Sequence, residues 1–520
     1  MRAFLWVFVA AGLGLAVRGL RPPAPLGLDA PAEAFSAARA WPTIQTLAAA
    51  PRARPSPHHA EARAFLADQL RALGLEIQEQ EAVVFKLPVT NLLARRPGTG
   101  ALNGAVLLCA HYDSVSAGPG AGDDALGCAV VLEIARALMA GPAPARDLIL
   151  LFTDGEEIAL LGARAFLGAD QSGAPHPWAS EVALALNFEA RGSGGQAWMF
   201  QTSASNGALV GALAGAPHPA ASSLAKAVYD RMPNDTDLTI FLAAGIPGLN
   251  WACIDRFASY HTALDTPERL DPGTLQQMGD QGLTVASWAL QHDGPFLAAD
   301  AAYFNFFGGQ FVHYPLSWSA WLAIVPAAAL LCWLRRRRTH WGSAALGLLA
   351  TLAILAAAAL VLLLAKSLFP DIFSLEASHA SDAHLRGWGH GIAGSAALLA
   401  ALGAWFAARR HPKLDLAAGT LALGAAGAVA LSWLLPEGAF LLWVPVVAIL
   451  AALLLPATGA TRILARGAAI VVTISLIWPW IYNLVLALSL AGILAPALLA
   501  AFTVLLLAPL WIVPPAPPKS

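Results

Sequence analysis

Five short segments of the chain carry histidines and carboxylates of the kind that bind metal ions. They are His111-Tyr112-Asp113, Asp123-Asp124, Asp154-Gly155-Glu156-Glu157, Asn187-Phe188-Glu189 and Tyr260-His261. Three of these segments lie where a stretch with strand character ends and a loop begins. Two imidazoles with several carboxylates, and no cysteine among them, suit a borderline cation such as zinc with carboxylate bridging. The pattern predicts one metal centre on the rim of a sheet and therefore a metallohydrolase.

Peptide hydrolysis at a paired-metal site makes specific demands on the residues around the ions. It needs a carboxylate that spans both ions, terminal ligands for each, and a further carboxylate that takes the proton from the attacking water. Glu156 and Glu157 are adjacent and project in different directions, so one can bind metal while the other faces the water. Asp113, two residues after His111, is placed to hold the imidazole by its other nitrogen.

Each of these signals alone has a simpler explanation. Asp123-Asp124 before a helix suits an N-cap that interacts well with the helix dipole, and Glu156-Glu157 suits a solvated turn. The conjunction of five segments favours the metal site. Arg191, beside a Gly-rich loop, suits either an ion pair or a contact with a substrate carboxylate, and the ion pair is favoured. His58 and His59 are expected at the surface.

The composition divides the chain into two parts. Of the 520 residues, 57% are hydrophobic and only 12% are charged, which is too apolar for a soluble protein. Up to about residue 300 the sequence mixes charge, Gly, Pro and turn signals as a globular domain does, and after Trp318 it runs in long Leu/Ala/Val stretches. The net charge of -2 gives no reason to expect a nucleic-acid partner. The four cysteines have neither zinc-finger nor disulfide spacing and are expected to be small hydrophobic residues.

The apolar stretches are long enough to cross a membrane, which takes about 20 residues. At the N-terminus, Ala3–Val17 lies between Arg2 and Arg18 without a clean small-residue cleavage site, so an uncleaved anchor is favoured over a signal peptide. Seven further candidates are Trp318–Leu334, Ala344–Ala365, Gly389–Ala408, Leu416–Leu435, Ala439–Leu455, Ala468–Leu488 and Ile493–Val513. Together they predict an integral, multi-pass protein of the lipid bilayer.

Basic residues follow every second predicted span. The clusters are Arg335–Arg338, Arg409–Lys413, Arg462–Arg466 and Lys519. Since cytoplasmic loops are enriched in Lys and Arg, these loops and the C-terminus are predicted to be cytoplasmic. The globular part is then extracytoplasmic, which means periplasm or cell surface in a bacterium.

Strand and helix signals alternate in the globular part. Helices are expected at His59–Leu73, Ala125–Met139 and Leu275–Gln291. Strands are expected at Leu75–Phe85, Thr90–Arg95, Ala105–Ala110, Asp147–Thr153, Val182–Phe188, Ala197–Gln201 and Ile246–Asn250. This alternation predicts an α/β, three-layer αβα domain with a mostly parallel mixed sheet, beside an all-α multi-span transmembrane bundle. The expected divisions are an anchor at 1–20, a Pro-rich linker at 21–40, the αβα domain at 41–300 and a bundle of about seven helices at 315–514.

The chain resembles the M28 family of zinc aminopeptidases in three runs of sequence. They are His111-Tyr112-Asp113-Ser114, Gly122-Asp123-Asp124-Ala125-x-Gly127 and Asp154-Gly155-Glu156-Glu157. Three further runs look like the membrane-embedded branch of that family, the vacuolar and endoplasmic-reticulum proteases. They are Asn187–Gly195, Asn234–Asp237 and Tyr260-His261-Thr262. Those relatives also carry an N-terminal span, a lumenal peptidase domain and a C-terminal multi-span bundle. The peptidase resemblance covers about residues 40–295, and the bundle is similar in topology only.

Carried over residue by residue, the resemblance implies a site with two zinc ions per chain. The implied ligands are His111, Asp123 and Glu189 for one ion, and Asp123, Glu157 and His261 for the other. Asp123 would be the bridging carboxylate and Glu156 the general base. Tyr260 matches a tyrosine that some relatives use to steady the tetrahedral intermediate. Many relatives have Asp at the place of Glu189, whereas the membrane-embedded branch has Glu.

The resemblance implies a membrane-anchored, zinc-dependent exopeptidase acting on a peptide or protein, and an aminopeptidase is favoured. A glutaminyl cyclase on the same fold would use a single zinc. A carboxypeptidase or narrow endopeptidase would need a different pocket wall. A non-catalytic, peptidase-like module of a membrane complex would be expected to have lost ligands or the base. Residue specificity, the physiological substrate and the oligomeric state have no readable signature in the sequence.

Overall fold

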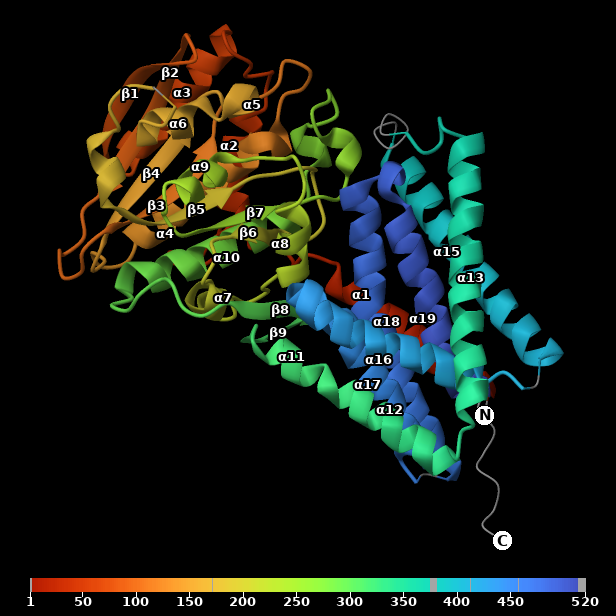
Figure 1. The fold of residues 1–520 in the computed structure, drawn as a ribbon. Helices are drawn as coiled ribbons and strands as arrows, with labels where there is room; N and C mark the ends of the chain where they lie inside the picture. Colours follow the sequence, from red (N-terminus) through yellow and green to blue (C-terminus); the bar gives the residue numbers. More distant parts are fainter. Residues whose placement is uncertain (1, 171, 375–380, 412, 457, 513–520) are drawn as a thin grey trace. The chain divides into compact units, whose positions relative to one another are not determined.

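The computed structural model describes residues 2–170, 172–374, 381–411, 413–456 and 458–512 (Figure 1). The chain divides into two compact units. One unit consists of Arg21–Phe304 with Phe311–His313, and the other of Met1–Leu20, Asn305–Gln310 and Tyr314–Ser520. The first holds a seven-stranded sheet, and the second is built from apolar helices.

The seven strands expected from the sequence all occur, and they form one sheet in the order β1-β2-β4-β3-β5-β7-β6. The strands are β1 (Glu76–Val84), β2 (Leu87–Arg96), β3 (Ala105–His111), β4 (Asp147–Thr153), β5 (Val182–Phe188), β6 (Trp198–Thr202) and β7 (Gly248–Ala252). The central strands β4, β3, β5 and β7 run parallel to one another. The pairings of β1 with β2, β2 with β4 and β6 with β7 are antiparallel. The predicted mixed α/β sheet is confirmed.

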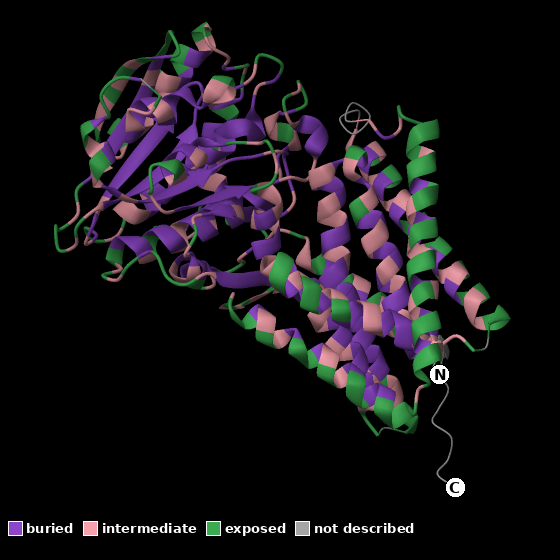
Figure 2. Ribbon diagram, in the orientation of Figure 1, coloured by how far each residue is buried: buried purple, intermediate pink, exposed green. Residues whose placement is uncertain are grey.

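Helices cover both faces of this sheet because its central strands are apolar on both sides. Every residue of β3 is buried, with Val106 and Leu108 in one apolar cluster and Leu107 and Cys109 in the other. Figure 2 shows the buried strands between layers of partly exposed helices. The first cluster includes residues of α2 (Ala37–Leu47), α3 (Pro57–Ala72), α4 (Gly127–Met139), α7 (Gly207–Leu213) and α10 (Pro272–Gln291), and the second includes residues of α6 (Leu161–Leu167) and α9 (Asp237–Ala243).

Several short helices have no clear signal in the sequence. They are α2, α5 (Glu156–Ala159), α6, α7, α8 (Ser223–Tyr229) and α9. None exceeds 11 residues, which is too short for a helical period to stand out against the loops. Helix α2 begins at Ala37, inside the stretch expected as linker, where the Ser36 hydroxyl accepts a hydrogen bond from the Arg39 amide.

The parallel strands bring the chemistry-bearing segments to one edge of the sheet. Strand β3 ends at His111, β4 ends three residues before Glu156, and Glu189 follows β5 directly. Because β4, β3 and β5 are neighbours and run in the same direction, their carboxyl ends meet at one edge. Asp123 reaches this edge from the irregular segment η1 (Ala121–Leu126), which lies between β3 and α4 and has a non-helical backbone at Asp123.

The second unit is an all-α bundle with six helices long and apolar enough to cross a membrane within the described residues. These are Trp318–Arg337 (α11 with α12), α13 (Trp341–Leu368), α15 (Asp382–Arg410), α16 (Leu416–Leu434), α18 (Gly459–Leu488) and α19 (Leu494–Ile512). The fifth predicted span forms the shorter apolar helix α17 (Phe440–Leu454). The N-terminal apolar stretch forms α1 (Arg2–Gly19). Two further strands, β8 (Ala301–Phe306) and β9 (Gln310–Pro315), form a separate two-stranded sheet that the sequence did not predict.

Candidate metal centre

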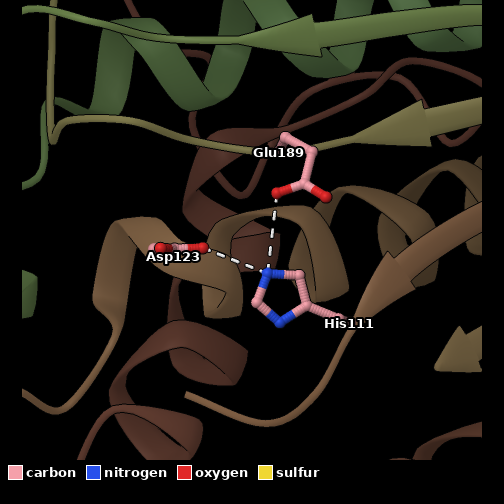
Figure 3. Close-up of side chains that lie close together, drawn as sticks. All are labelled: His111, Asp123 and Glu189. Atoms are coloured by element: carbon pink, nitrogen blue, oxygen red, sulfur yellow. Dashed lines mark hydrogen bonds and ion pairs between the residues drawn. The ribbon is translucent and has the colours of Figure 1, made fainter. Parts of the chain in front are cut away.

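The first group of potential ligands is assembled around His111 at the end of β3 (Figure 3). Its Nε2 lies 3.0 Å from Asp123 Oδ1 and 3.5 Å from Glu189 Oε2. All three side chains are buried. Neighbouring ligands of a tetrahedral zinc, at about 2.0–2.2 Å from the ion, lie roughly 3.3–3.5 Å from one another. The spacing of these donor atoms therefore fits one zinc ion.

The second group shares Asp123 with the first. His261 Nε2 lies 3.1 Å from Asp123 Oδ2 and 3.0 Å from Glu157 Oε2. The two oxygens of Asp123 thus face different histidines, as a carboxylate bridging two ions requires. The structure brings together all five residues that the sequence nominated as ligands, in the two groups that the resemblance implied.

The remaining oxygens of the carboxylates are held by neighbouring groups. Glu157 Oε1 accepts a hydrogen bond from the Val115 amide at 3.1 Å, and Glu189 Oε1 accepts one from the Asn187 side chain at 3.3 Å. Such contacts fix which oxygen of each carboxylate faces the site.

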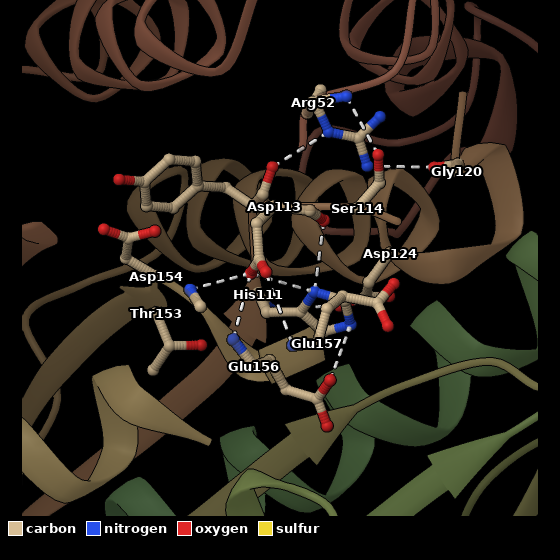
Figure 4. A network of polar contacts seen from close by, with 12 residues as sticks. Arg52, His111, Asp113, Ser114, Gly120, Asp124, Thr153, Asp154, Glu156 and Glu157 are labelled. Carbon is tan, nitrogen blue, oxygen red and sulfur yellow. Dashed lines mark hydrogen bonds and ion pairs between the residues drawn. The ribbon is translucent and has the colours of Figure 1, made fainter. Parts of the chain in front are cut away.

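Asp113 connects His111 to the segment that carries Glu156 (Figure 4). Its Oδ1 lies 3.5 Å from His111 Nδ1, whose nearer contact is the Asp113 carbonyl oxygen at 3.2 Å. The same Oδ1 accepts hydrogen bonds from the amides of Gly155 at 3.0 Å and Glu156 at 3.1 Å. The carboxylate of Asp113 thus holds the first turn of α5, and with it the glutamate expected to act as base, whose Oε2 lies 3.9 Å from His111 Nε2.

The site concentrates negative charge. Burial, followed by the charge of Asp123, raises the pKa of Glu157 to about 7, and burial with the charge of Glu189 raises the pKa of Glu156 well above its usual value. Although burial favours neutral His261, hydrogen bonds with Asp123 and Glu157 raise its pKa to about 10. Four carboxylates around two imidazoles carry an excess of negative charge, which divalent cations would balance. This donor set fits zinc, with no sulfur ligand required.

Two buried aspartates that sequence reasoning did not single out as functional hold the loop of Asp123. Asp265 accepts hydrogen bonds from the amides of Gly122 and Asp123 at 2.8 and 3.0 Å. Asp124 accepts from the His111 amide at 3.2 Å and the Gly127 amide at 2.9 Å. The only signal for Asp265 was its place four residues after His261, which says nothing of a contact with a loop more than 140 residues away.

Asp154, in the same run as the two glutamates, lies outside the two ligand groups. Its carboxylate binds Arg54 Nε at 2.7 Å, His59 Nε2 at 2.9 Å and the Thr90 amide at 2.8 Å. His59 is therefore buried in an ion-paired cluster at the start of α3, and the expectation that it lies at the surface was wrong. Asp237 is also buried, and its Oδ2 accepts a hydrogen bond from the Thr153 hydroxyl at 2.5 Å.

Two side chains flank His261 and Glu189 without joining either group. The ring of Tyr260 stacks on that of His261, with centroids 3.8 Å apart. The guanidinium of Arg191 lies over the ring of Tyr260 at 5.8 Å and over that of Phe257 at 5.3 Å. The ion pair favoured for Arg191 from the sequence is absent from the part of the chain that the structure describes.

Comparison with known proteins identifies the family of this domain. Residues 91–286 match peptidase family M28. The chain is 37% identical to endoplasmic reticulum metallopeptidase 1 of Rattus norvegicus over 220 residues, which is 41% of this chain and 24% of the relative. It is 30% identical to a vacuolar membrane protease of Candida albicans over 239 residues, which is 46% of this chain and 27% of the relative. The chain thus spans about a quarter of the length of the curated relatives that it matches.

Solved structures with a similar fold include an aminopeptidase from Aneurinibacillus sp. strain AM-1, with a TM-score of 0.41 and 14% identity. That match covers 52% of this chain and 97% of the other. Glutaminyl cyclase of Porphyromonas gingivalis has a TM-score of 0.40 and 22% identity, over 49% of this chain and 99% of the other.

Proposed function

Residues 91–286 form a peptidase family M28 domain, and on this premise we propose that the chain is a membrane-bound aminopeptidase with two zinc ions. The family is one of zinc-dependent metallopeptidases, and the relatives named above are membrane proteins of the endoplasmic reticulum and vacuole. The observation that carries the proposal is the placement of Asp123, whose two oxygens lie against His111 and His261 respectively.

The residues that would hold the ions follow from the two donor groups. His111 and Glu189 would complete one site and Glu157 and His261 the other, with Asp123 in both. When bound, the zinc ions would polarise the scissile carbonyl, acidify the attacking water and hold the free amino group of a peptide end.

Glu156 is the proton carrier in this proposal. Its carboxylate is buried beside His111 but belongs to neither donor group, so its oxygens are free to face the water. A carboxylate at this place can act as the general base that the attacking water requires. Glu156 takes a proton from the attacking water and returns it to the leaving amine.

Asp113 and Tyr260 have supporting roles. Asp113 is a positioning residue, because it contacts His111 and holds the amide of Glu156. Tyr260 is partly buried beside His261, and its hydroxyl makes no hydrogen bond among the described residues. That hydroxyl is therefore available to donate to the oxyanion that develops on the scissile carbonyl.

We infer the membrane orientation from the basic clusters. Arg335–Arg337 end α12, Arg409 and Arg410 end α15, and Arg462 lies in the first turn of α18. If α17 also crosses the bilayer, these clusters share one side, which the positive-inside rule makes cytoplasmic. The peptidase unit, which precedes the first of these spans, is then extracytoplasmic. Fusion of a periplasm-active reporter at residue 300 or at Thr339 tests this, with activity expected for the first fusion only.

The deciding experiment measures hydrolysis and metal content together. Detergent-purified protein is assayed on aminoacyl substrates and on their N-blocked counterparts, with zinc counted in the same preparation. Glu156→Gln keeps the size of the side chain but removes its basicity, so it is expected to retain about two zinc ions and to lose activity by about 10²–10⁴-fold. Glu61→Gln, on the exposed face of α3, is the matched control and is expected to behave as wild type.

The other outcomes identify the alternatives. Cleavage of N-blocked substrates alone would indicate an endopeptidase or carboxypeptidase. One zinc per chain with cyclisation of N-terminal glutamine would indicate a glutaminyl cyclase. Absence of both zinc and hydrolysis would favour a non-catalytic module of a membrane complex.

A further inference from the structure

Arg191 lies on the same face of the chain as the proposed ligand Glu189. The segment after β5 continues in extended form beside β7, because the amides of Glu189, Arg191 and Ser193 donate in turn to the carbonyls of Trp251, Cys253 and Asp255 at 2.9, 2.9 and 3.0 Å. In extended chain, side chains two residues apart point to the same face, and their backbone positions are roughly 7 Å apart. Arg191 is therefore directed to the metal side, about two residues' length beyond Glu189.

The guanidinium of Arg191 has no partner within the described part of the chain. It makes neither an ion pair nor a side-chain hydrogen bond there, and its Nε is buried without an acceptor. Its guanidinium carbon lies 5.3 Å from the ring centroid of Phe257 and 5.8 Å from that of Tyr260, beside two rings that are themselves neighbours. Contacts with ring faces leave the N–H donors in the plane of the guanidinium without acceptors. A partly buried charge with unused donors is costly unless a ligand accepts their hydrogen bonds.

Two other arginines of this unit, Arg52 and Arg39, have hydrogen-bonding partners. Arg52 is fully buried, yet it donates to the carbonyl oxygens of Tyr112, Leu47 and Gly120 at 2.9, 3.0 and 3.0 Å. Arg39 donates to Glu133 at 2.9 Å. Arg191 differs from them in being both unpaired and partly exposed, so a solute can reach it.

The carboxylates of the two donor groups face the histidines of the site. Glu189 faces His111, and Glu157 faces His261. Burial lowers the pKa of Arg191, and the groups that act against this shift are the phenols of Tyr260 and Tyr229. Tyr260 in turn stacks on the proposed ligand His261, so Arg191 reaches the surroundings of the proposed site through this ring.

We propose that Arg191 binds a carboxylate of the peptide substrate and thereby sets the preference of the site for short or acidic peptides. A planar guanidinium with free in-plane donors fits a carboxylate in a bidentate way, as Lys cannot. Arg191 lies about two residues beyond the proposed ligand Glu189. This spacing suits a substrate carboxylate that lies one or two residues beyond the cleaved bond. The C-terminal carboxylate of a dipeptide or tripeptide, or an acidic side chain, would supply the same chemistry. This inference rests on the proposed peptidase function.

The first test measures binding and does not depend on turnover. In the Glu156→Gln background, calorimetry compares a tripeptide free acid with its C-terminal amide, and an Ala-Glu amide with an Ala-Gln amide. One carboxylate is expected to tighten binding by about tenfold or more, the value of a charge-assisted hydrogen bond. The first pair reports the C-terminal carboxylate and the second reports the side chain. Equal affinity within both pairs would overturn the proposal.

Variants locate the effect at Arg191. Arg191→Met keeps the aliphatic stack on Tyr260 and Phe257 but removes the charge, so it is expected to abolish the acid-over-amide preference while zinc content stays that of wild type. Arg191→Lys is expected to retain only part of it. Arg63→Met, an arginine of α3 paired with Glu79 at 3.7 Å, is the matched control and should keep the full preference. If Arg191→Met keeps the preference, or weakens acid and amide equally, the residue has only a packing role.

Turnover in the active protein separates this inference from the proposed function. With Arg191 intact, KM is expected to be about tenfold lower for free-acid than for amide peptides, with similar kcat, because the contact is made equally in the ground and transition states. Arg191→Met should raise KM for the acid alone. A wild type that hydrolyses nothing would refute the proposed function, whereas the binding preference would still decide the role of Arg191.

Discussion

The carboxylate of Asp265 binds the backbone of Asp123, the residue whose two oxygens face the two histidines of the site. Asp265 Oδ2 accepts a hydrogen bond from the Asp123 amide at 3.0 Å. Its Oδ1 accepts from the Gly122 amide at 2.8 Å and from the Ser193 hydroxyl at 3.0 Å. Asp265 therefore links the loop that carries Asp123 to the segment that follows Glu189. It holds the proposed bridging carboxylate in place relative to another proposed ligand.

Replacement of Asp265 should weaken metal binding although its side chain touches no ion. Asp265→Asn places an amide N–H₂ against backbone donors, so one contact is lost and Asp123 is less firmly held. We expect zinc affinity to fall by about 10–100-fold, the usual effect of losing a group that orients a ligand. The measurement is zinc retention against a graded competing chelator, with Asp230→Asn on the exposed end of α8 as control. Unchanged retention in Asp265→Asn would contradict this role.

Asp113 should affect turnover more than metal content. Its Oδ1 holds the amides of Gly155 and Glu156, and the His111 ring is also held by the Asp113 backbone carbonyl, which substitution preserves. Asp113→Ala is expected to lower kcat by about 10–100-fold through a misplaced base, with most of the zinc retained. Steady-state kinetics with parallel zinc analysis tests this. A loss of zinc as large as the loss of kcat would instead assign Asp113 to the ligand scaffold.

The sequence predicted the parts of the fold and site that depend on local pattern. Apolar strands such as β3 are readable because burial on both faces leaves a continuous hydrophobic run, and His111 is readable because it ends that run. The role of Asp154 was not readable, because it depends on His59 and Arg54, which lie about 100 residues earlier in the chain. Asp265 escaped notice for the same reason. Contacts between loops of distant sequence leave no periodic signal.

Removal of metal should destabilise the peptidase unit. Three carboxylates, those of Asp123, Glu157 and Glu189, meet in two adjoining groups that share Asp123, and without cations their mutual repulsion opposes folding. Dialysis against a chelator is therefore expected to abolish activity and lower the melting temperature by several degrees, and added zinc should restore both. Differential scanning fluorimetry of holo and stripped protein gives the comparison. In Asp123→Asn the added zinc should produce a smaller shift, and an identical shift would place the stabilising ion elsewhere.

The membrane bundle should depend on close contact between α13 and α16. A Cβ added at Gly419 would overlap the backbone of Gly347, and Thr351 Oγ1 lies 3.0 Å from Thr420 Oγ1 beside this contact. Small residues let helices approach closely in a membrane, so Gly419→Leu should force the pair apart and lower the thermal stability of the bundle in detergent. Gly394→Leu on α15, where an added Cβ meets nothing within 4 Å, is the matched control. Equal melting profiles for both variants would show that the contact is dispensable.

Asp280 should make the peptidase unit less stable as the pH rises from about 4 to about 6. Burial raises its pKa to about 6, while the Gln276 side chain donates a hydrogen bond to Oδ1 at 2.9 Å. Between the unfolded and folded pKa values the folded protein holds a proton that the unfolded chain has lost, so the free energy of unfolding falls with rising pH. Asp280→Asn keeps an acceptor for Gln276 and lacks this titration. Its stability relative to wild type should therefore grow by about 2 kcal/mol from pH 4 to pH 7, or roughly 4 °C in melting temperature, and stay constant above pH 7. A difference that is flat across this range would mean that the carboxylate ionises as freely in the folded protein as in the unfolded chain.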